Sequence, residues 1–171
     1  MLTFAILNAR SDTPQRVLLG ARDEVRAALL GVLGAAQREV RIMARDLSVF
    51  GLDQGEIVAT FERLLMSNRR ARVRLLADDI QWIEARAPRL KRLQRSFTHA
   101  LQIRVAAHED AVGDEACLLV DSDTSLRLEH TARARGEVWL HNETRLQPLG
   151  AIFERRWDAA AHDLAVAPLG L

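Results

Sequence analysis

The stretch ARVRLLADD (residues 71–79) decides the fold class. Its first half alternates between apolar and charged residues, and its second half is a continuous apolar run that stops at Asp78 and Asp79. A run of this kind is typical of a strand in a sheet that is covered on both faces, because both sides of such a strand need apolar side chains. We therefore expect an inner strand of a sheet that lies between two layers of helices.

Helices and short strands alternate along the rest of the chain. Apolar residues recur at helical spacing in four segments, and the capping-box pair Asp53 and Glu56 marks the start of the second. The expected helices cover residues 17–37, 53–68, 88–99 and 146–160. The expected further strands cover residues 2–7, 40–44, 101–106, 115–121, 126–130 and 136–142. This order predicts an α/β fold with a single mixed sheet flanked by helices.

Composition limits the class of protein. The chain has 171 residues and a net charge of +1, which suits one domain over residues 1–171 and argues against a general nucleic-acid binder with a strong basic excess. Cys117 is the only cysteine, so one chain can build neither a disulfide nor a cysteine-based zinc site. The apolar stretch near the N-terminus is too short for a signal peptide or a membrane span. We expect a cytoplasmic protein without a membrane partner.

Common catalytic and nucleotide-binding motifs are missing from the sequence. It contains no GxxxxGK[ST] loop, no GxGxxG loop and no GxSxG nucleophile elbow. The five histidines do not follow a metal-ligand pattern either. We therefore expect no cofactor and no metal.

Charged side chains follow several of the expected strands. Arg45 and Asp46, Asp78, and His108 each come after a strand, and they would gather at one edge of the sheet if those strands are parallel neighbours. Asp121, at the end of a further strand, completes this candidate binding cleft. The competing explanation is structural, because charged residues commonly end strands, cap helices and occupy solvated loops.

Arginines form three candidate phosphate-binding groups. One is the run RRARVR (residues 69–74), and Arg133 and Arg135 form a second, small cluster. A solvated helix end and a solvated loop explain both of these equally well. The third is a series at successive i+3 spacings that would form a basic ridge on one helix, namely Arg86, Arg89, Arg92 and Arg95. Because acidic residues elsewhere nearly cancel the positive charge, nucleic-acid contact is an alternative and not the first expectation.

Several segments, taken in order, resemble one half of the phospholipase D superfamily. They are AAQREVRIMARDLS (35–48), EIVATFERLLMSNRRARVRLLADD (56–79), ACLLVD (116–121) and NETRLQPLGAIFERRWDAA (142–160). The last has phenylalanine and tryptophan, here Phe153 and Trp157, at the spacing of the family's closing helix. The resemblance covers about residues 20–160 and implies a phospholipase D-like half domain, similar to small bacterial proteins of uncharacterised activity.

The catalytic motif of that superfamily, H-x-K-x-x-x-x-D, is incomplete in this sequence. In the family the histidine attacks phosphorus and the lysine stabilises the phosphate charge. With Asp121 at the aspartate position, Asp114 stands at the histidine position and Ala116 at the lysine position. LRLEH (126–130) takes the place of the Gly-Ser-x-Asn segment that follows in the family. The resemblance therefore implies a degenerate domain that does not hydrolyse phosphodiesters.

The function expected first is a non-catalytic binding or interaction module for an anionic or phosphate-containing ligand. Family enzymes join two halves with their sites facing each other, so a single half is expected to form a homodimer. One alternative is a phosphodiesterase or other hydrolase with a relocated site, in which His108 is the acid/base and Arg45 or Arg127 holds an anion. The other is a nucleic-acid-associated protein that uses its arginine-rich helix. Whether the chain is an enzyme stays open, although the missing histidine and lysine favour a binding role.

Overall fold

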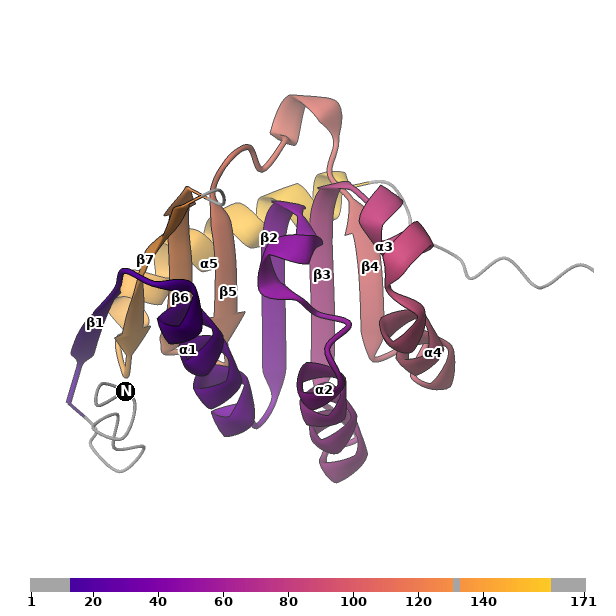
Figure 1. The fold of residues 1–171 in the computed structure, drawn as a ribbon, viewed down its shortest axis with the longest axis horizontal. Coiled ribbons are helices and arrows are strands. Elements are labelled where there is room, and N and C mark those ends of the chain that lie inside the picture. Colours follow the sequence, from indigo (N-terminus) through magenta and orange to yellow (C-terminus); the bar gives the residue numbers. More distant parts are fainter. Residues whose placement is uncertain (1–12, 131–132, 161–171) are drawn as a thin grey trace, which may run out of the picture.

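The computed structural model describes residues 13–130 and 133–160. These residues form one mixed sheet of seven strands in the order β1-β7-β6-β5-β2-β3-β4 (Figure 1). The strands are β1 (Gln15–Leu19), β2 (Glu39–Asp46), β3 (Arg72–Asp79), β4 (Leu101–Val105), β5 (Ala116–Val120), β6 (Thr124–His130) and β7 (Arg133–Leu140). The α/β fold with a single mixed sheet flanked by helices, expected from the sequence, is confirmed.

Helices cover both faces of the sheet. One face is covered by α1 (Arg22–Ala35), α2 (Gly55–Ser67), α3 (Gln81–Arg86) and α4 (Pro88–Ser96), and the other by α5 (Glu143–Ala159) (Figure 1). Two short 3₁₀ turns, η1 (Leu47–Phe50) and η2 (His108–Asp110), follow β2 and β4. Among the described residues, no helix is both long and apolar enough to cross a membrane.

The direction of the strands defines two edges of the sheet. β2, β3 and β4 are parallel, so all three begin at one edge and end at the other. We term these the lower edge and the upper edge, as they lie at the bottom and top of Figure 1. β5 is antiparallel to β2, with Val120 opposite Val40 and Ala116 opposite Ala44, so β5 begins at the upper edge and ends at the lower edge.

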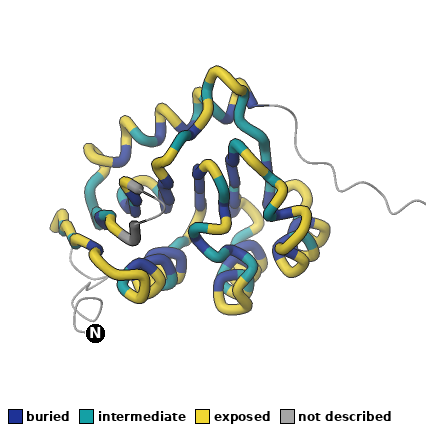
Figure 2. Tube along the Cα trace, turned by 45° about the horizontal axis from the view of Figure 1, so that its top comes forward, coloured by how far each residue is buried: buried dark blue, intermediate teal, exposed yellow. Residues whose placement is uncertain are grey.

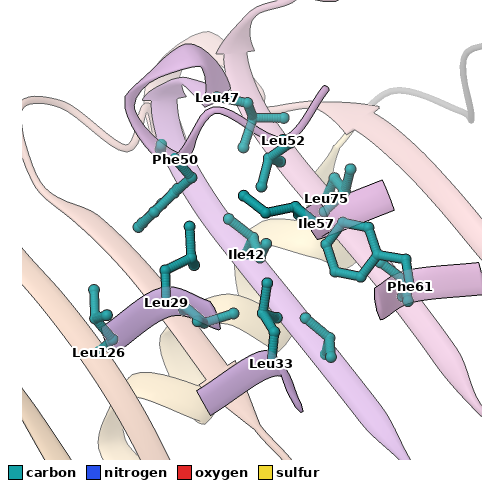
Figure 3. Close-up of a cluster of buried hydrophobic side chains, with 14 of the residues drawn as sticks. Leu29, Leu33, Ile42, Leu47, Phe50, Leu52, Ile57, Phe61, Leu75 and Leu126 are labelled. Carbon is teal, nitrogen blue, oxygen red and sulfur yellow. The ribbon is translucent and has the colours of Figure 1, made fainter. Parts of the chain in front are cut away.

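The main core lies between the sheet and helices α1 to α4. Ile42 and Leu75 of the sheet meet Leu29 and Leu33 of α1 and Phe61 of α2 (Figure 3). In Figure 2 the helices turn their buried sides toward the sheet and their exposed sides outward. The helical spacing of the apolar residues therefore predicted which faces are buried.

A second, smaller core lies under α5. Leu76 and Cys117 of the sheet pack there with Phe153 and Trp157, whose rings stack with centroids 5.6 Å apart. Burial in this core raises the pKa of the Cys117 thiol to about 12. The cysteine is therefore a packing residue and is not an activated thiol.

The first strand differs from the expectation. The predicted helix over 17–37 begins only at Arg22, and β1 precedes it as an edge strand that pairs antiparallel with β7. Arg16 of β1 pairs with Glu137 of β7 at 2.8 Å. The helix prediction failed at this end because the partner of β1 lies more than 100 residues away in the sequence. The strand predicted over residues 2–7 lies outside the described residues.

Two local predictions on the helical side were wrong. Gln54, without a side-chain cap, stands before α2, and the Asp53 carboxylate instead accepts the backbone N–H of Leu90 at 2.8 Å. The helix predicted over 88–99 ends at Ser96 and is preceded by the separate helix α3. Arg86 ends α3 and Arg89 lies on α4, so the four arginines spaced by three do not share one helix.

Candidate functional site

Four of the five residues predicted to form a cleft lie at the upper edge. Arg45 and Asp46 end β2, Asp78 is near the end of β3, and His108 begins η2 after β4. They share an edge because β2, β3 and β4 run parallel, which was the condition stated for their convergence.

The two aspartates at the upper edge already have structural partners. Asp46 Oδ1 accepts the backbone N–H of Ser48 at 2.8 Å and caps η1. The Asp78 carboxylate accepts the N–H groups of Val112 at 2.7 Å and Gly113 at 3.1 Å, and so holds the loop after η2. These contacts support the structural explanation for both carboxylates.

Arg45 and His108 point to solvent. Arg45 pairs with Asp114 at 3.1 Å, and the two side chains are 64% and 71% exposed. His108 is exposed, and no hydrogen bond or ion pair to another described residue orients its ring. The described residues also contain no cluster of three or more histidine, cysteine or acidic side chains that could hold a metal ion.

Asp121 does not join this group, which corrects the predicted cleft. Since β5 is antiparallel to β2, its last residues lie at the lower edge, at the opposite end of the sheet from Arg45. The Asp121 carboxylate accepts three backbone N–H groups, from Gln37 at 3.0 Å, Arg38 at 2.8 Å and Glu39 at 2.9 Å. It fastens the turn between α1 and β2 to the end of β5.

The positions aligned with the catalytic histidine and lysine lie at the start of β5. Asp114 is exposed and paired with Arg45, whereas Ala116 is fully buried. On the neighbouring strand, Arg127 donates to Glu115 at 2.6 Å, and this hydrogen bond is the main cause that raises the pKa of Arg127. Both Arg45 and Arg127 are therefore already paired with carboxylates.

The lower edge gathers basic side chains from three loops. The loops 36–38, 68–71 and 97–100 each precede one of the parallel strands. Arg72 N donates to Arg38 O at 2.9 Å, Asn68 Nδ2 to Gln37 O at 3.0 Å, and Val73 N to Ala100 O at 2.7 Å, so the three loops lie side by side. This arrangement brings together segments that span more than 60 residues of sequence.

These loops and the end of α4 form what we term the lower-edge basic surface. Its members are all exposed and comprise Arg38, Arg69, Arg70, Arg72, Arg95 and His99. Arg72 donates only to the backbone carbonyls of Arg69 and Ala71. Among the described residues, no carboxylate pairs with any member of this surface. The arginine run is visible in the sequence, but its position beside Arg38 was not predicted.

Two carboxylates at the lower edge form no ion pair with this surface among the residues that the structure describes. Asp121 accepts three backbone N–H groups. Glu39 pairs with Arg74 at 2.6 Å and with Arg41 at 3.5 Å, under α5. The side chains of the lower-edge basic surface are therefore not held in ion pairs by these two carboxylates.

A cavity of about 730 Å³ adjoins the same edge. It lies between the end of α1, the turn that joins β5 to β6, and the end of β7. Val32 and Leu140 are among its apolar lining residues, and Asp123 and His141 line it on the polar side. Arg38 lines the cavity as well as belonging to the basic surface.

A carboxylate orients the histidine of this cavity. His141 Nδ1 lies 3.2 Å from Asp123 Oδ2, and Thr124 Oγ1 donates to Asp123 Oδ1 at 3.0 Å. His141 has a left-handed backbone, with φ of 53°. Because an ionised carboxylate only accepts, Nδ1 is the donor, which leaves Nε2 directed away from Asp123. The sequence carried no signal for this pair, because only the pairing of β6 with β7 brings positions 123 and 141 together.

The sequence matches a recognised protein family over most of its length. Residues 21–169 match the family described as Domain of unknown function (DUF7931). The chain belongs to this family. No curated protein matches the sequence.

The DUF7931 chain is similar in fold to several solved structures. One is Nuc from Salmonella typhimurium, a phospholipase D family member, with 14% identity, a TM-score of 0.63, and coverage of 88% of this chain and 98% of that chain. NucT from Helicobacter pylori has 10% identity, a TM-score of 0.59, and coverage of 88% and 99%. The archaeal chromatin protein TrmBL2 has 14% identity and a TM-score of 0.64 over 92% of this chain, which spans 57% of the TrmBL2 chain.

These likenesses establish a phospholipase D-like fold for the DUF7931 chain. The match extends over nearly the whole length of Nuc and NucT. At identities of 14% or less the likeness concerns the fold alone. The function of this chain must therefore be inferred from its own residues.

Proposed function

We propose that this protein is a non-hydrolytic phospholipase D-like module that binds nucleic acid through the lower-edge basic surface. The observation that carries the proposal is the convergence of three loops whose basic side chains have no carboxylate partner in the part of the chain that the structure describes. Phosphate groups along a nucleic-acid strand are the regularly spaced anions that such a surface fits.

The positive charge on this surface exceeds the negative charge of the helix termini at the same edge. Helices α1, α2 and α4 end at the lower edge, and each helix C-terminus carries about half a negative elementary charge. Three such termini amount to roughly one and a half negative charges. The five arginines of the surface exceed that amount even when the negative charges of Asp121 and Asp123 at the same edge are added to it, so a net positive charge remains.

The absence of hydrolysis is supported by the start of β5. Asp114 is an anion where the family has its nucleophilic histidine, so it would repel a phosphodiester. Ala116 has no charge to place on a phosphate and is buried. A relocated hydrolytic site has less support, because the ring of His108 has no orienting partner among the described residues.

The upper edge is the less favoured binding surface. Its aspartates, Asp46 and Asp78, are occupied by backbone N–H groups, and Arg45 is paired with Asp114. TrmBL2 is described as binding DNA, which indicates that a related fold occurs in a DNA-binding protein. That likeness identifies no contact in this chain, so the proposal rests on the lower edge.

The test is binding of a fluorescent 15-nucleotide single strand, measured by anisotropy over a range of salt concentrations. Replacing two arginines, Arg69→Gln with Arg70→Gln, is expected to weaken binding about tenfold or more and to reduce the slope of log K against log salt by about 1.4. The matched control is Arg22→Gln with Arg86→Gln, which removes the same charge from exposed positions outside the lower-edge basic surface.

Three outcomes would overturn the proposal. One is that the wild-type protein does not bind single-stranded DNA or RNA at low salt. Another is that the control variant loses as much affinity as the lower-edge variant. The third is that vesicles containing phosphatidylserine bind through the same arginines while nucleic acid does not, which would assign the surface to membranes.

A further inference from the structure

The cavity at the lower edge lies beside the basic surface and shares Arg38 with it. Its volume of about 730 Å³ falls in the range of small-molecule binding sites. The side chains of Asp123 and His141 are 38% and 25% exposed, so a group that enters from solvent can reach both. A ligand that contacts Arg38 is therefore next to this cavity.

The charges of the cavity separate two parts of a ligand. Asp121 and Asp123 line it together with one arginine, Arg38, so an anionic phosphate is disfavoured inside. The other four arginines lie outside, on the adjoining basic surface. A strand whose phosphates contact those arginines would thus offer an uncharged group to the cavity.

The polar lining favours hydrogen-bond donors. Each oxygen of Asp123 accepts one hydrogen bond, from Thr124 or from His141, and a carboxylate has room for about four. His141 Nε2 has no partner among the described residues, and in the tautomer that donates from Nδ1 it is an acceptor. The Asp123 carboxylate and His141 Nε2 therefore both retain the capacity to accept a hydrogen bond.

An exocyclic amino group of a nucleobase is an N–H donor that can use the remaining acceptor capacity of the Asp123 carboxylate. Carboxylates recognise the cytosine amino group in this way. The apolar side chains of Val32 and Leu140 supply contacts for the faces of the ring. Thymine and uracil have a carbonyl oxygen in place of the pyrimidine amino group. This oxygen and the Asp123 carboxylate are both acceptors, so they cannot form a hydrogen bond with each other.

We infer that this cavity binds one unstacked nucleobase with an exocyclic amino group, namely cytosine, adenine or guanine, from a single strand whose phosphates contact the lower-edge basic surface. The inference rests on the proposed function and names the ligand class of the same edge. A base inside a duplex is stacked between neighbours and cannot enter a recessed cavity, so the ligand is single-stranded.

The experiment compares dC15 with dT15, fluorescently labelled, at pH 8 and fixed salt. The two probes have equal length and charge, and they differ at the 4-position, where an amino group replaces a carbonyl oxygen, and in the thymine methyl group. The wild-type full chain is expected to bind dC15 about fivefold or more tightly than dT15. dU15, which lacks the methyl group, is expected to bind like dT15.

Two variants test the cavity itself. Asp123→Asn replaces one carboxylate acceptor by an amide, and Ala35→Trp fills the cavity from an exposed position on α1. Both are expected to reduce the preference for dC15 over dT15 to less than about twofold. Ala59→Trp, at an exposed position on α2, is the matched control and is expected to keep the preference.

The outcomes separate this inference from the proposed function. Equal, salt-dependent binding of dC15 and dT15 would overturn the cavity inference and leave the basic surface standing. No binding of either strand would overturn the proposed function and the inference with it. A preference for dC15 that survives both Asp123→Asn and Ala35→Trp would show that the base is recognised elsewhere.

Discussion

Arg74 and Glu154 form a two-point ion pair across the space between β3 and α5. Arg74 Nη1 donates to Glu154 Oε2 and Nη2 donates to Oε1, each at 2.7 Å. The same guanidinium lies 5.2 Å from the ring centroid of Phe153 and 5.4 Å from that of Trp157. The pair attaches α5 to the charged half of β3, where the alternation of the sequence places an arginine toward this helix.

Glu154→Gln is expected to lower the free energy of unfolding by about 1–2 kcal/mol. The change removes one of the two carboxylates, Glu39 and Glu154, that Arg74 and Arg41 share, while both arginines remain largely buried. The expected loss of stability is smaller than that for a fully buried ion pair because the Glu154 side chain is 42% exposed. Urea unfolding followed by circular dichroism measures the change.

The control for this prediction is Glu56→Gln. Glu56 pairs with Arg26 on the surface, where both side chains are more than half exposed. Its loss is expected to cost less than about 0.5 kcal/mol. An equal effect of the two substitutions would contradict a specific role for the pair under α5.

Stability is expected to fall as the pH drops below about 4.5. Burial alone would raise the pKa of Glu154, but the hydrogen bonds from Arg74 and Arg41 outweigh it and lower the pKa below the ordinary value of 4.5. For Glu137, burial is likewise outweighed by hydrogen bonds from Arg145 and Arg16. A lowered pKa contributes stability above the unfolded value, and that stability is lost as the pH falls through the folded value.

Urea unfolding at intervals from pH 7 to pH 3 measures this dependence. The double variant Glu137→Gln with Glu154→Gln is expected to be less stable at pH 7 and to lose less stability on acidification. A wild-type protein and a double variant with parallel pH profiles would contradict the assignment of this acid sensitivity to these two carboxylates.

Asp121→Ala is expected to destabilise the protein by about 2–4 kcal/mol, since it leaves three backbone N–H groups without their acceptor. Asp121 also has a φ of 50°, which alanine tolerates less well than aspartate or asparagine. Asp121→Asn is expected to cost less than Asp121→Ala. Thermal and urea unfolding measure both changes.

Asp46→Ala is the comparison for Asp121→Ala. It removes an acceptor for a single N–H group, that of Ser48, and is expected to cost about 1 kcal/mol. If Asp121→Ala cost no more than Asp46→Ala, the three-way contact would not be the fastening point that its geometry indicates.

The wild-type protein is expected to show no phosphodiesterase activity above that of a mock purification. The reason is the absence of a nucleophile and of a phosphate-binding cation at positions 114 and 116. Turnover of a chromogenic phosphodiester is the measurement, with His108→Ala and Arg45→Ala tested in parallel. Wild-type turnover that disappears in His108→Ala would instead favour a relocated hydrolytic site.

We propose that the protein forms a homodimer across its upper edge, where the exposed Arg45 and Asp114 can pair with their copies in a two-fold arrangement. Light scattering is expected to give the mass of a dimer for the wild-type chain. Arg45→Glu should shift the protein toward monomer, and combining it with Asp114→Arg should restore the dimer. A wild-type monomer at high protein concentration would contradict the proposal.

The sequence alone predicted those elements whose pattern is local. The apolar run that ends at Asp78 indicated a strand in a covered sheet, and the spacing of Phe153 and Trp157 indicated the closing helix. The element boundaries were wrong where a distant partner decides them. Residues 15–19 form a strand because they pair with β7. Asp53 does not cap α2, because its carboxylate accepts the backbone N–H of Leu90 on α4.

The candidate site depended still more on tertiary structure. The sequence placed Asp121 in a cleft with Arg45, but the antiparallel direction of β5 sends it to the other end of the sheet. Two features could be read directly from the identity of the residues. They are the absence of the catalytic histidine and lysine and the presence of the arginine run at residues 69–74. The basic surface and the Asp123–His141 pair were decided by strand pairing alone, since the direction and order of strands determine which loops meet at one edge.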